Sequence, residues 1–257
     1  MMLSDARLDR FARQIIIPEI GGAGQVALDG TQVTLVGLGG IGSPVLQYLA
    51  AAGIGQLRLI DDGDVELSNL QRQTIYTQRD IGHAKAVAAR RWLANFDSEI
   101  TVDVRDDRIT AGNAAALLEG SGLVLDGTDN FATRLAVSDS CVALGIPLLS
   151  AAVGRFQGQV AAFAGHLPDQ PCYRCFVGDA FDNDDCDTCA DDGMLGAMAG
   201  WAGSFAAMRA VSVLLDGVAA IGDPAFGKVH MMDGLKAEMR SFRVVKDPAC
   251  KGCGLPG

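Results

Sequence analysis

The sequence predicts an α/β fold, in which a Rossmann-like, mostly parallel sheet carries helices on both faces. Two patterns support this prediction. A glycine-rich loop directly follows an early β-rich strand, and strand-like runs then alternate with helical runs as far as residue 150. The composition, with 49% apolar and 20% charged residues in a chain of 257, allows a sizeable core.

The predicted elements of this first part follow one another in the order expected of a parallel sheet. Each strand is a short apolar run, and each helix follows a loop that contains Gly, Asp or Asn. Such alternation predicts that the helices cross over between parallel strands. The predicted strands are 31–36, 56–60, 100–104, 123–125 and 147–150, and the predicted helices are 41–52, 84–95, 113–118 and 132–144.

The C-terminal part is organised differently, with a weakly alternating run, a helix rich in Ala, Gly and Met, and two antiparallel strands joined at an Asp-Gly turn. These are 159–163, 195–215, 228–232 and 238–244. We expect one continuous domain over 1–257. Its first part, with the glycine-rich loop, covers about 1–155, and a crossover and C-terminal part covers about 156–257.

The charge balance argues against nucleic acid and membranes as partners. The 21 Lys and Arg are outnumbered by 31 Asp and Glu, so the net charge is −10. Residues 1–10 lack the apolar core of a signal peptide, and the apolar run 194–207 is too short to span a bilayer. Seven cysteines, an odd number, suit a reducing compartment. We therefore expect a cytoplasmic protein.

The glycine-rich loop predicts a nucleotide site. It follows a strand, opens a helix and has the G-x-G-x-x-G pattern, which lets the backbone approach phosphate at a helix N-terminus. Asp61 ends the next strand, 19 residues after the last glycine, where a carboxylate can bind ribose hydroxyls. The alternative is a packing turn without a ligand. The glycines of the pattern are Gly37, Gly39, Gly40 and Gly42.

Polar residues that follow later strands extend this site to a triphosphate. The ligand-facing carboxyl edge of the sheet should carry the loop of residues 64–73, Lys85 at the next helix start, and Asp129, whose oxygens suit Mg²⁺. Separately, Arg72 and Lys85 can be solvated surface charges, and Asp129-Asn130 can cap a helix. The loop residues in question are Ser68, Asn69, Leu70, Gln71, Arg72 and Gln73.

Two C-x₂-C pairs predict a structural zinc site. Cys172 and Cys175 form one pair, Cys250 and Cys253 the other, and four thiolates on two tight turns suit tetrahedral Zn²⁺. Because Cys250 follows Cys175 by 75 positions, the metal would tie the tail to the crossover segment. The alternative is two independent redox or accidental pairs. Cys141, in an apolar helix, is interpreted as a buried small hydrophobe.

These motifs, in order, resemble the ThiF/MoeB/HesA adenylyltransferases, the bacterial relatives of ubiquitin-activating enzymes. The resemblance covers nearly the whole chain and includes GLGGIG, the Asp61 strand end, SNLQRQ, Lys85, DGTDN and the opening RFARQI of residues 10–15. It implies that the glycine loop, Asp61 and Asp62 contact the nucleotide. Asn69, Arg72 and Lys85 would contact the triphosphate, Asp129 would bind Mg²⁺ and Asn130 would line the site.

The resemblance also implies the reaction and the partners. ATP would adenylate the C-terminal glycine carboxylate of a ubiquitin-like sulfur carrier ending in Gly-Gly, ThiS- or MoaD-like, in thiamine or molybdenum cofactor biosynthesis. Arg13 would reach across a homodimer interface into the partner's ATP site. Cys189 would be a nucleophile for the carrier, although nearby Asp residues disfavour its thiolate. Sulfur would come from a separate cysteine desulfurase or rhodanese.

Three other functions remain open on the residues alone. The same ATP chemistry can act on a peptide or a tRNA, although the negative charge disfavours RNA. A nicotinamide-dependent oxidoreductase shares the glycine motif, but His83, His166 and His230 are scattered and none has an evident partner for hydride transfer. A zinc-bound interaction module without activity is the third alternative.

Overall fold

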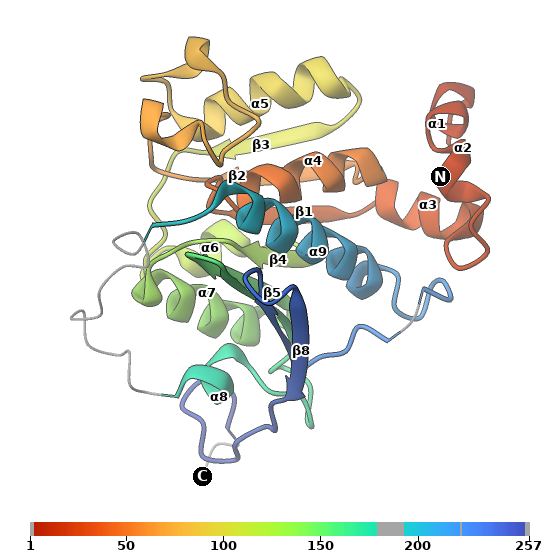
Figure 1. Ribbon diagram of the computed structural model, residues 1–257. Coiled ribbons are helices and arrows are strands. Elements are labelled where there is room, and N and C mark those ends of the chain that lie inside the picture. Colours follow the sequence, from red (N-terminus) through yellow and green to blue (C-terminus); the bar gives the residue numbers. More distant parts are fainter. Residues whose placement is uncertain (1–2, 179–192, 222, 255–257) are drawn as a thin grey trace.

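The computed structural model describes residues 3–178, 193–221 and 223–254, and it confirms the predicted α/β architecture (Figure 1). One sheet of eight strands has the order β3-β2-β1-β4-β5-β6-β7-β8. The strands from β3 to β5 are parallel, whereas β6, β7 and β8 each pair antiparallel with the strand before them.

The elements match the predicted order closely. The strands are β1 Gln32–Val36, β2 Gln56–Ile60, β3 Thr101–Arg105, β4 Leu123–Asp126, β5 Leu148–Gly154, β6 Gln157–Phe163, β7 Lys228–Asp233 and β8 Glu238–Arg243. The α-helices are α1 Asp5–Arg10, α2 Ala12–Ile15, α3 Gly21–Asp29, α4 Gly42–Ala52, α5 Lys85–Phe96, α6 Ala114–Leu118, α7 Phe131–Leu144, α8 Tyr173–Val177 and α9 Gly196–Leu214. Two short 3₁₀ helices are η1 Leu67–Asn69 and η2 Gln78–Asp80.

Helices cover both faces of the sheet, so successive residues of the central strands enter two separate cores (Figure 1). In β4, Leu123 and Leu125 pack in the core under α4 and α9, whereas Val124 packs in the core under α6 and α7. All residues of β4 are buried. A strand covered on both sides has a continuous apolar run rather than an alternating one, which is why the sequence here shows no period of two.

Helix α9 is a core helix, and it matches the predicted helix 195–215 to within one residue at each end. Among the described helices it alone is long and apolar enough to cross a membrane by length and composition, and half of that stretch is buried within the protein. It packs against α4, β5 and β6. A Cβ atom at Gly203 would overlap the ring of Pro44 on α4, so the small residues of α9 serve close helix packing.

The β5–β6 hairpin is where the sheet changes from parallel to antiparallel. The sequence predicted only 147–150 and 159–163 as strands, but both extend to a tight turn in which Gly154 pairs with Gln157 and Arg155 has φ = 47°. Glycine and polar residues near the turn interrupt the apolar pattern from which the ends of these strands could have been predicted. The predicted division of the chain near residue 155 falls in this turn, and the single-domain organisation over 1–257 stays a proposal.

An N-terminal buried ion cluster, which the sequence did not predict, fixes the segment that leads to Arg13. Arg7 is 4% exposed, and its guanidinium lies 2.5 Å from an oxygen of Asp29 and 2.6 Å from one of Asp97. A buried cation is tolerated when its donors are paired in this way. The cluster holds α1 against the ends of α3 and α5, so α2 and Arg13 emerge at a defined place on the surface.

Candidate active site

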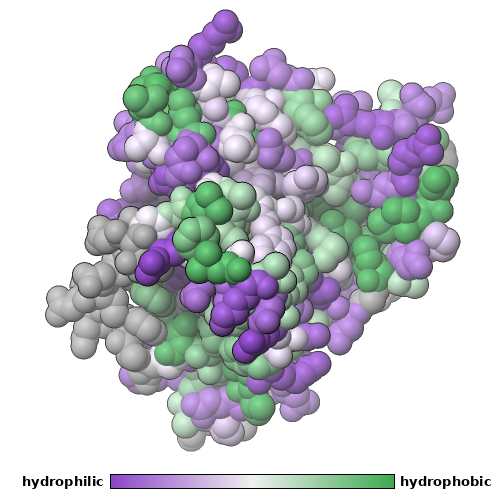
Figure 2. Space-filling model, in the orientation of Figure 1, coloured by the Kyte–Doolittle hydropathy of each residue, from purple (hydrophilic) through white to green (hydrophobic). Residues whose placement is uncertain are grey.

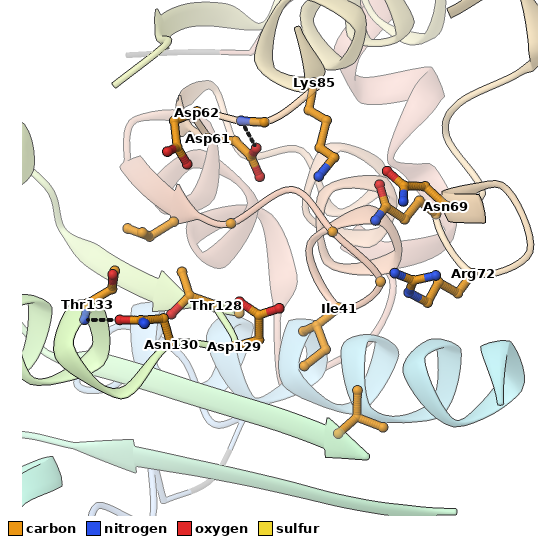
Figure 3. Close-up of a pocket in the computed structure, with 18 of the residues that line it drawn as sticks. Ile41, Asp61, Asp62, Asn69, Arg72, Lys85, Thr128, Asp129, Asn130 and Thr133 are labelled. Carbon is orange, nitrogen blue, oxygen red and sulfur yellow. Dashed lines mark hydrogen bonds between the residues drawn. The ribbon is translucent and has the colours of Figure 1, made fainter. Parts of the chain in front are cut away.

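A cavity of about 470 Å³ lies at the carboxyl ends of β1, β2 and β4 (Figure 3). This is the edge where a doubly wound sheet binds its ligand, because the loops that follow adjacent parallel strands meet there. Most residues of the predicted nucleotide site line it. They are Gly37, Gly39, Gly40, Asp61, Asp62, Asn69, Gln71, Arg72, Gln73, Lys85, Asp129 and Asn130.

The glycine loop needs its glycines for two different reasons. Gly37 has φ = 86°, and a Cβ atom there would lie 3.1 Å from the backbone carbon of Gly127 in the loop after β4. Gly42 does not line the cavity, but a Cβ atom there would overlap the carbonyl oxygen of Gly37. Gly37 thus permits the turn and its contact with the next loop, and Gly42 permits the helix to begin directly behind the turn.

The carboxylate of Asp61 is held by the backbone on both oxygens. Leu38 N donates to one oxygen at 2.7 Å, and Gly63 N donates to the other at 2.9 Å. Burial raises the pKa of Asp61, while the charge of Lys85 and the two N–H donors act in the opposite direction. Each oxygen keeps a further acceptor site, so the carboxylate can fix the glycine loop and still accept from a ribose hydroxyl.

Tyr76, which the sequence analysis did not single out, supports the same loop. It is 5% exposed, and its hydroxyl lies 3.0 Å from the carbonyl oxygen of Leu38 and 3.3 Å from that of Lys85. Burial raises its pKa well above the usual range, so the phenol stays protonated and can donate. It therefore ties the phosphate loop to the start of α5.

The SNLQRQ segment divides into residues that face the cavity and residues that shape the turn. Asn69 is buried, and its side-chain oxygen accepts from Glu66 N at 3.2 Å. Arg72 donates to the carbonyl of Ser68 at 3.0 Å and keeps its guanidinium in the cavity. Ser68 bonds Glu66 and Leu70 packs on the core, so neither lines the cavity, contrary to our expectation for them.

Acidic and basic side chains both line the cavity, with Asp61 near Lys85 and Asp129 on the loop after β4 (Figure 3). Lys85, Asn69 and Arg72 point into one end, and Asp129 faces them from the loop after β4. The Asp129 side chain is exposed to the cavity, whereas the neighbouring Asn130 caps α7, accepting from Thr133 N at 2.9 Å. Cations for phosphate and a carboxylate for a divalent ion therefore share one cavity.

Sequence reasoning missed part of the cavity lining. Asp107 and Arg108 follow β3, and Thr128, Thr133 and Arg134 belong to the loop after β4 and the first turns of α7. The signal for the first two was available, since β3 ends at the same edge of the sheet as β1 and β2. Arg134 carried no local signal, because its place depends on how α7 packs.

Two predicted catalytic residues remain to be placed. Arg13 is exposed on α2 and does not line the cavity. Cys189 lies outside the described residues, as does Cys186, so the role of Cys189 stays a prediction.

The four predicted zinc ligands come together from two distant segments. The Sγ atoms of Cys172, Cys175, Cys250 and Cys253 all lie within 4.8 Å of one another. Cys172 is 4.0 Å from Cys175 and 3.6 Å from Cys250, and Cys175 is 3.4 Å from Cys253. A tetrahedral zinc site with Zn–S bonds of about 2.3 Å needs sulfurs about 3.8 Å apart, so the cluster fits the ion.

The surroundings of the cluster support a structural role. Burial raises the pKa of Cys175 to about 11, so a bound cation is needed to hold this thiolate at neutral pH. Arg174 donates two hydrogen bonds to the carboxylate of Asp139 on α7, which fixes the first cysteine pair to this helix. None of the four cysteines lines the cavity described above.

A second cavity of about 600 Å³ adjoins the first. It follows the β5–β6 turn, from Ala152 to Gln159, and is flanked by Met231 and Leu235. Apolar side chains gather on this face, in front of the β7–β8 turn and the start of α9 (Figure 2). Both cavities are lined by Asp129, Arg134 and Val153, so they meet at these residues.

The sequence matches the model of the ThiF family over residues 11–253. It is 39% identical to the sulfur carrier protein adenylyltransferase of Thermus thermophilus, covering 99% of this chain and 93% of that relative. It is 38% identical to the molybdopterin-synthase adenylyltransferase of Salmonella typhimurium, with 98% of each chain covered. Identity to the SAMP-activating enzyme E1 of Haloferax volcanii is 36%, over 100% of this chain and 93% of that relative.

Solved structures of Escherichia coli MccB share the fold. The complex of MccB with ATP matches this chain with a TM-score of 0.83 at 22% identity, covering 99% of this chain and 77% of that chain. At this identity the likeness establishes the architecture and not the substrate.

Proposed function

The chain belongs to the ThiF family, and from this premise we propose that it is an adenylyltransferase for a ubiquitin-like sulfur carrier protein. ATP is its co-substrate, and the C-terminal glycine carboxylate of the carrier is the acceptor. The observation that carries the proposal is the cavity in which Arg72 and Lys85 face Asp129 across the glycine loop. The names of relatives that align over nearly the whole chain support the same activity.

The reaction follows from the chemistry of the two substrates. A carboxylate oxygen of the carrier attacks the α-phosphorus, the bond from this phosphorus to the bridging oxygen breaks, and pyrophosphate leaves with that electron pair. Such a step needs alignment and charge neutralisation more than a covalent group on the protein. The glycine loop would hold the phosphates, Asp61 and Asp62 the ribose, and Asn69, Gln73, Arg72 and Lys85 the charged end.

The two metal ions would have separate tasks. Asp129 offers an exposed carboxylate in the cavity, which suits Mg²⁺, and the bound ion would supply positive charge to the phosphates. The cysteine cluster suits Zn²⁺, which would tie the C-terminal tail to the crossover segment.

The finer parts of the proposal concern partners. A homodimer is included because Arg13 is exposed outside the cavity of its own chain. The carrier is ThiS- or MoaD-like and ends in Gly-Gly, and its sulfur comes from a separate cysteine desulfurase or rhodanese. A cytoplasmic location stays part of the proposal, and cell fractionation checks it.

ATP–pyrophosphate exchange tests the function. Exchange should appear only with a Gly-Gly-ended carrier and should vanish when the last glycine of the carrier is deleted. Arg72→Ala should lower kcat about 100-fold, because one fixed donor to the developing charge is lost. Arg79→Ala is the matched control, since Arg79 lies outside the cavity lining.

Exchange that needs no carrier, or that Arg72→Ala leaves unchanged, would contradict the proposal. Binding of NADH in preference to ATP would instead favour the oxidoreductase, and exchange driven by a peptide or a tRNA would replace the acceptor while keeping the ATP chemistry.

Mixed dimers test the role of Arg13. Arg13→Ala and Asp129→Ala chains should each be inactive alone. Mixed in equal amounts, they should recover about a quarter of the wild-type exchange rate, because half of the dimers are mixed and each holds one intact site. Size-exclusion chromatography would verify that dimers form and exchange. No recovery in verified mixed dimers would mean that Arg13 does not serve the partner's site.

A further inference from the structure

Arg134 is the cation that lies where the two cavities meet. It is on α7, one turn after Asn130, and it is 5% exposed, yet it lines both the nucleotide cavity and the cavity along the β5–β6 turn. Arginine side chains usually extend into solvent, whereas this one is buried and lines two cavities. Burying its charge costs free energy, and its hydrogen bonds offset that cost.

The guanidinium joins the two walls of this junction. Its Nη2 atom donates to the carbonyl oxygen of Thr128, the residue before Asp129, and to that of Ala151 on β5 at 3.2 Å. Beyond Ala151, β5 continues through Ala152 and Val153, which line the second cavity. One side chain thus connects the loop that bears the proposed magnesium ligand to the strand that lines the second cavity.

The backbone N–H and C=O groups of Thr128 are both hydrogen-bonded by buried side chains, those of Asp126 and Arg134. Asp126 is 1% exposed, and its Oδ1 accepts from Thr128 N at 2.9 Å and from Thr128 Oγ1 at 2.7 Å. Arg134 donates to the carbonyl oxygen of the same residue. Burial raises the pKa of Asp126, and the positive charge of Arg134 acts in the opposite direction. With its N–H and its C=O both held, this residue fixes the direction in which Asp129 leaves the loop.

An arginine that served only to compensate the charge of Asp126 would not need to line the two cavities, as Arg134 does. Arg209 on α9 provides a comparison, because its Nη2 also donates to two carbonyls, those of Asp223 at 2.9 Å and Pro224 at 2.6 Å. Arg209 lines neither cavity, so it secures a loop without reaching the site.

We propose that Arg134 is a positioning residue for the adenylation site. It clamps the Thr128–Asp129 peptide to β5, and it thereby holds the Asp129 carboxylate at the point where the acceptor's carboxylate reaches the nucleotide. The inference rests on the proposed function, and it adds a physical link between the second cavity, into which the proposal places the acceptor, and the divalent-ion ligand. Groups that orient a metal ligand typically change metal affinity or activity about 10- to 100-fold when they are lost.

The test uses Arg134→Lys with Arg209→Lys as the matched control. Lysine keeps the charge but cannot donate to both carbonyls in the fixed geometry of a guanidinium. Binding of a non-hydrolysable ATP analogue is measured by calorimetry, first without and then with increasing Mg²⁺. We expect Arg134→Lys to leave metal-free binding within about 3-fold of wild type and to weaken the apparent Mg²⁺ affinity about 10-fold.

Kinetics provide the second readout. In carrier-dependent exchange at saturating Mg²⁺, Arg134→Lys should lower kcat about 10- to 100-fold with little change in the KM for ATP, because orientation and not ground-state binding is lost. Arg209→Lys should keep the wild-type kcat and Mg²⁺ dependence, even if its unfolding midpoint falls as far as that of Arg134→Lys.

The outcomes separate this inference from the proposed function. Wild-type Mg²⁺ dependence and kcat in Arg134→Lys would overturn the inference and leave the function intact, whereas failure of the wild-type chain to bind ATP would overturn the function. If Arg134→Lys does not fold, Arg134→Gln decides. Glutamine is shorter and neutral, so it loses the guanidinium link between the carbonyls of Thr128 and Ala151, and it should weaken Mg²⁺ affinity in the same direction. Wild-type Mg²⁺ dependence in Arg134→Gln would then overturn the inference.

Discussion

Replacing Asp129 with alanine is expected to lower carrier-dependent ATP–pyrophosphate exchange by about 1,000-fold, the largest single effect at this site. The reason is its position. Asp129 is the exposed carboxylate that faces Arg72 and Lys85 across the cavity, and it also lines the second cavity, where the acceptor would arrive. Without Asp129, the divalent ion would lose its ligand, and the phosphates would no longer be aligned with the carboxylate of the acceptor.

Binding measurements separate this loss from a loss of the nucleotide site. Asp129→Ala should still bind an ATP analogue without metal, because the glycine loop, Arg72 and Lys85 are unchanged, but added Mg²⁺ should no longer tighten binding. Asp106→Ala is the control, since this acidic residue of the loop after β3 does not line the cavity. Exchange by Asp129→Ala at a tenth of the wild-type rate or more would rule out its proposed role.

The second large effect concerns stability. In the double variant Cys172→Ser/Cys175→Ser, two of the four clustered thiolates are lost, and bound zinc should fall from about one ion per chain to none. The unfolding midpoint should fall by about 10 °C, because the C-terminal tail loses its link to the crossover segment and each kcal/mol shifts a chain of this size by about 2–4 °C.

Elemental analysis and calorimetry check both parts, and Cys141→Ala is the matched control. Cys141 is buried in α7 outside the cluster, so its variant should keep its zinc. Removal of zinc from wild type with a chelator should reproduce the lowered midpoint. A double variant that retains zinc would exclude the cluster as the site, and one that loses zinc without a change in the midpoint would exclude a structural role. ATP-analogue binding by the folded fraction should persist, because the cysteines do not line the cavity.

Much of the fold could be predicted because its signals are local. The strand, glycine turn and helix around Gly37 and Gly42 are dictated by sterics within a few residues, and the structure has them where expected. The β5–β6 hairpin was underestimated, because its strand ends near Arg155 gain their order from pairing and not from an apolar pattern. Helix α9 was predicted over 195–215 and forms over Gly196–Leu214, where it packs on α4 and the sheet.

Parts of the site could not be predicted, because a motif does not reveal which of its side chains face a ligand. Within SNLQRQ, Asn69 and Arg72 line the cavity while Ser68 and Leu70 hold the turn. Arg108 could have been predicted, because it follows β3 and the ends of parallel strands meet at one edge of the sheet. Arg134 was not, because its contacts with Thr128 and Ala151 depend on how α7 lies against β4 and β5.

The sequence by itself determined the order of strands and helices, the phosphate loop and the two cysteine knuckles, because hydrophobic period, glycine geometry and ligand spacing act over short stretches of chain. Only the tertiary structure decided what those pieces form together. The strand order brings β4 beside β1, so Asp129 faces the glycine loop from about 90 residues away, and the fold brings Cys250 to Cys172. Cavities and metal clusters depend on such non-local contacts, and these are set by the packing of the whole sheet.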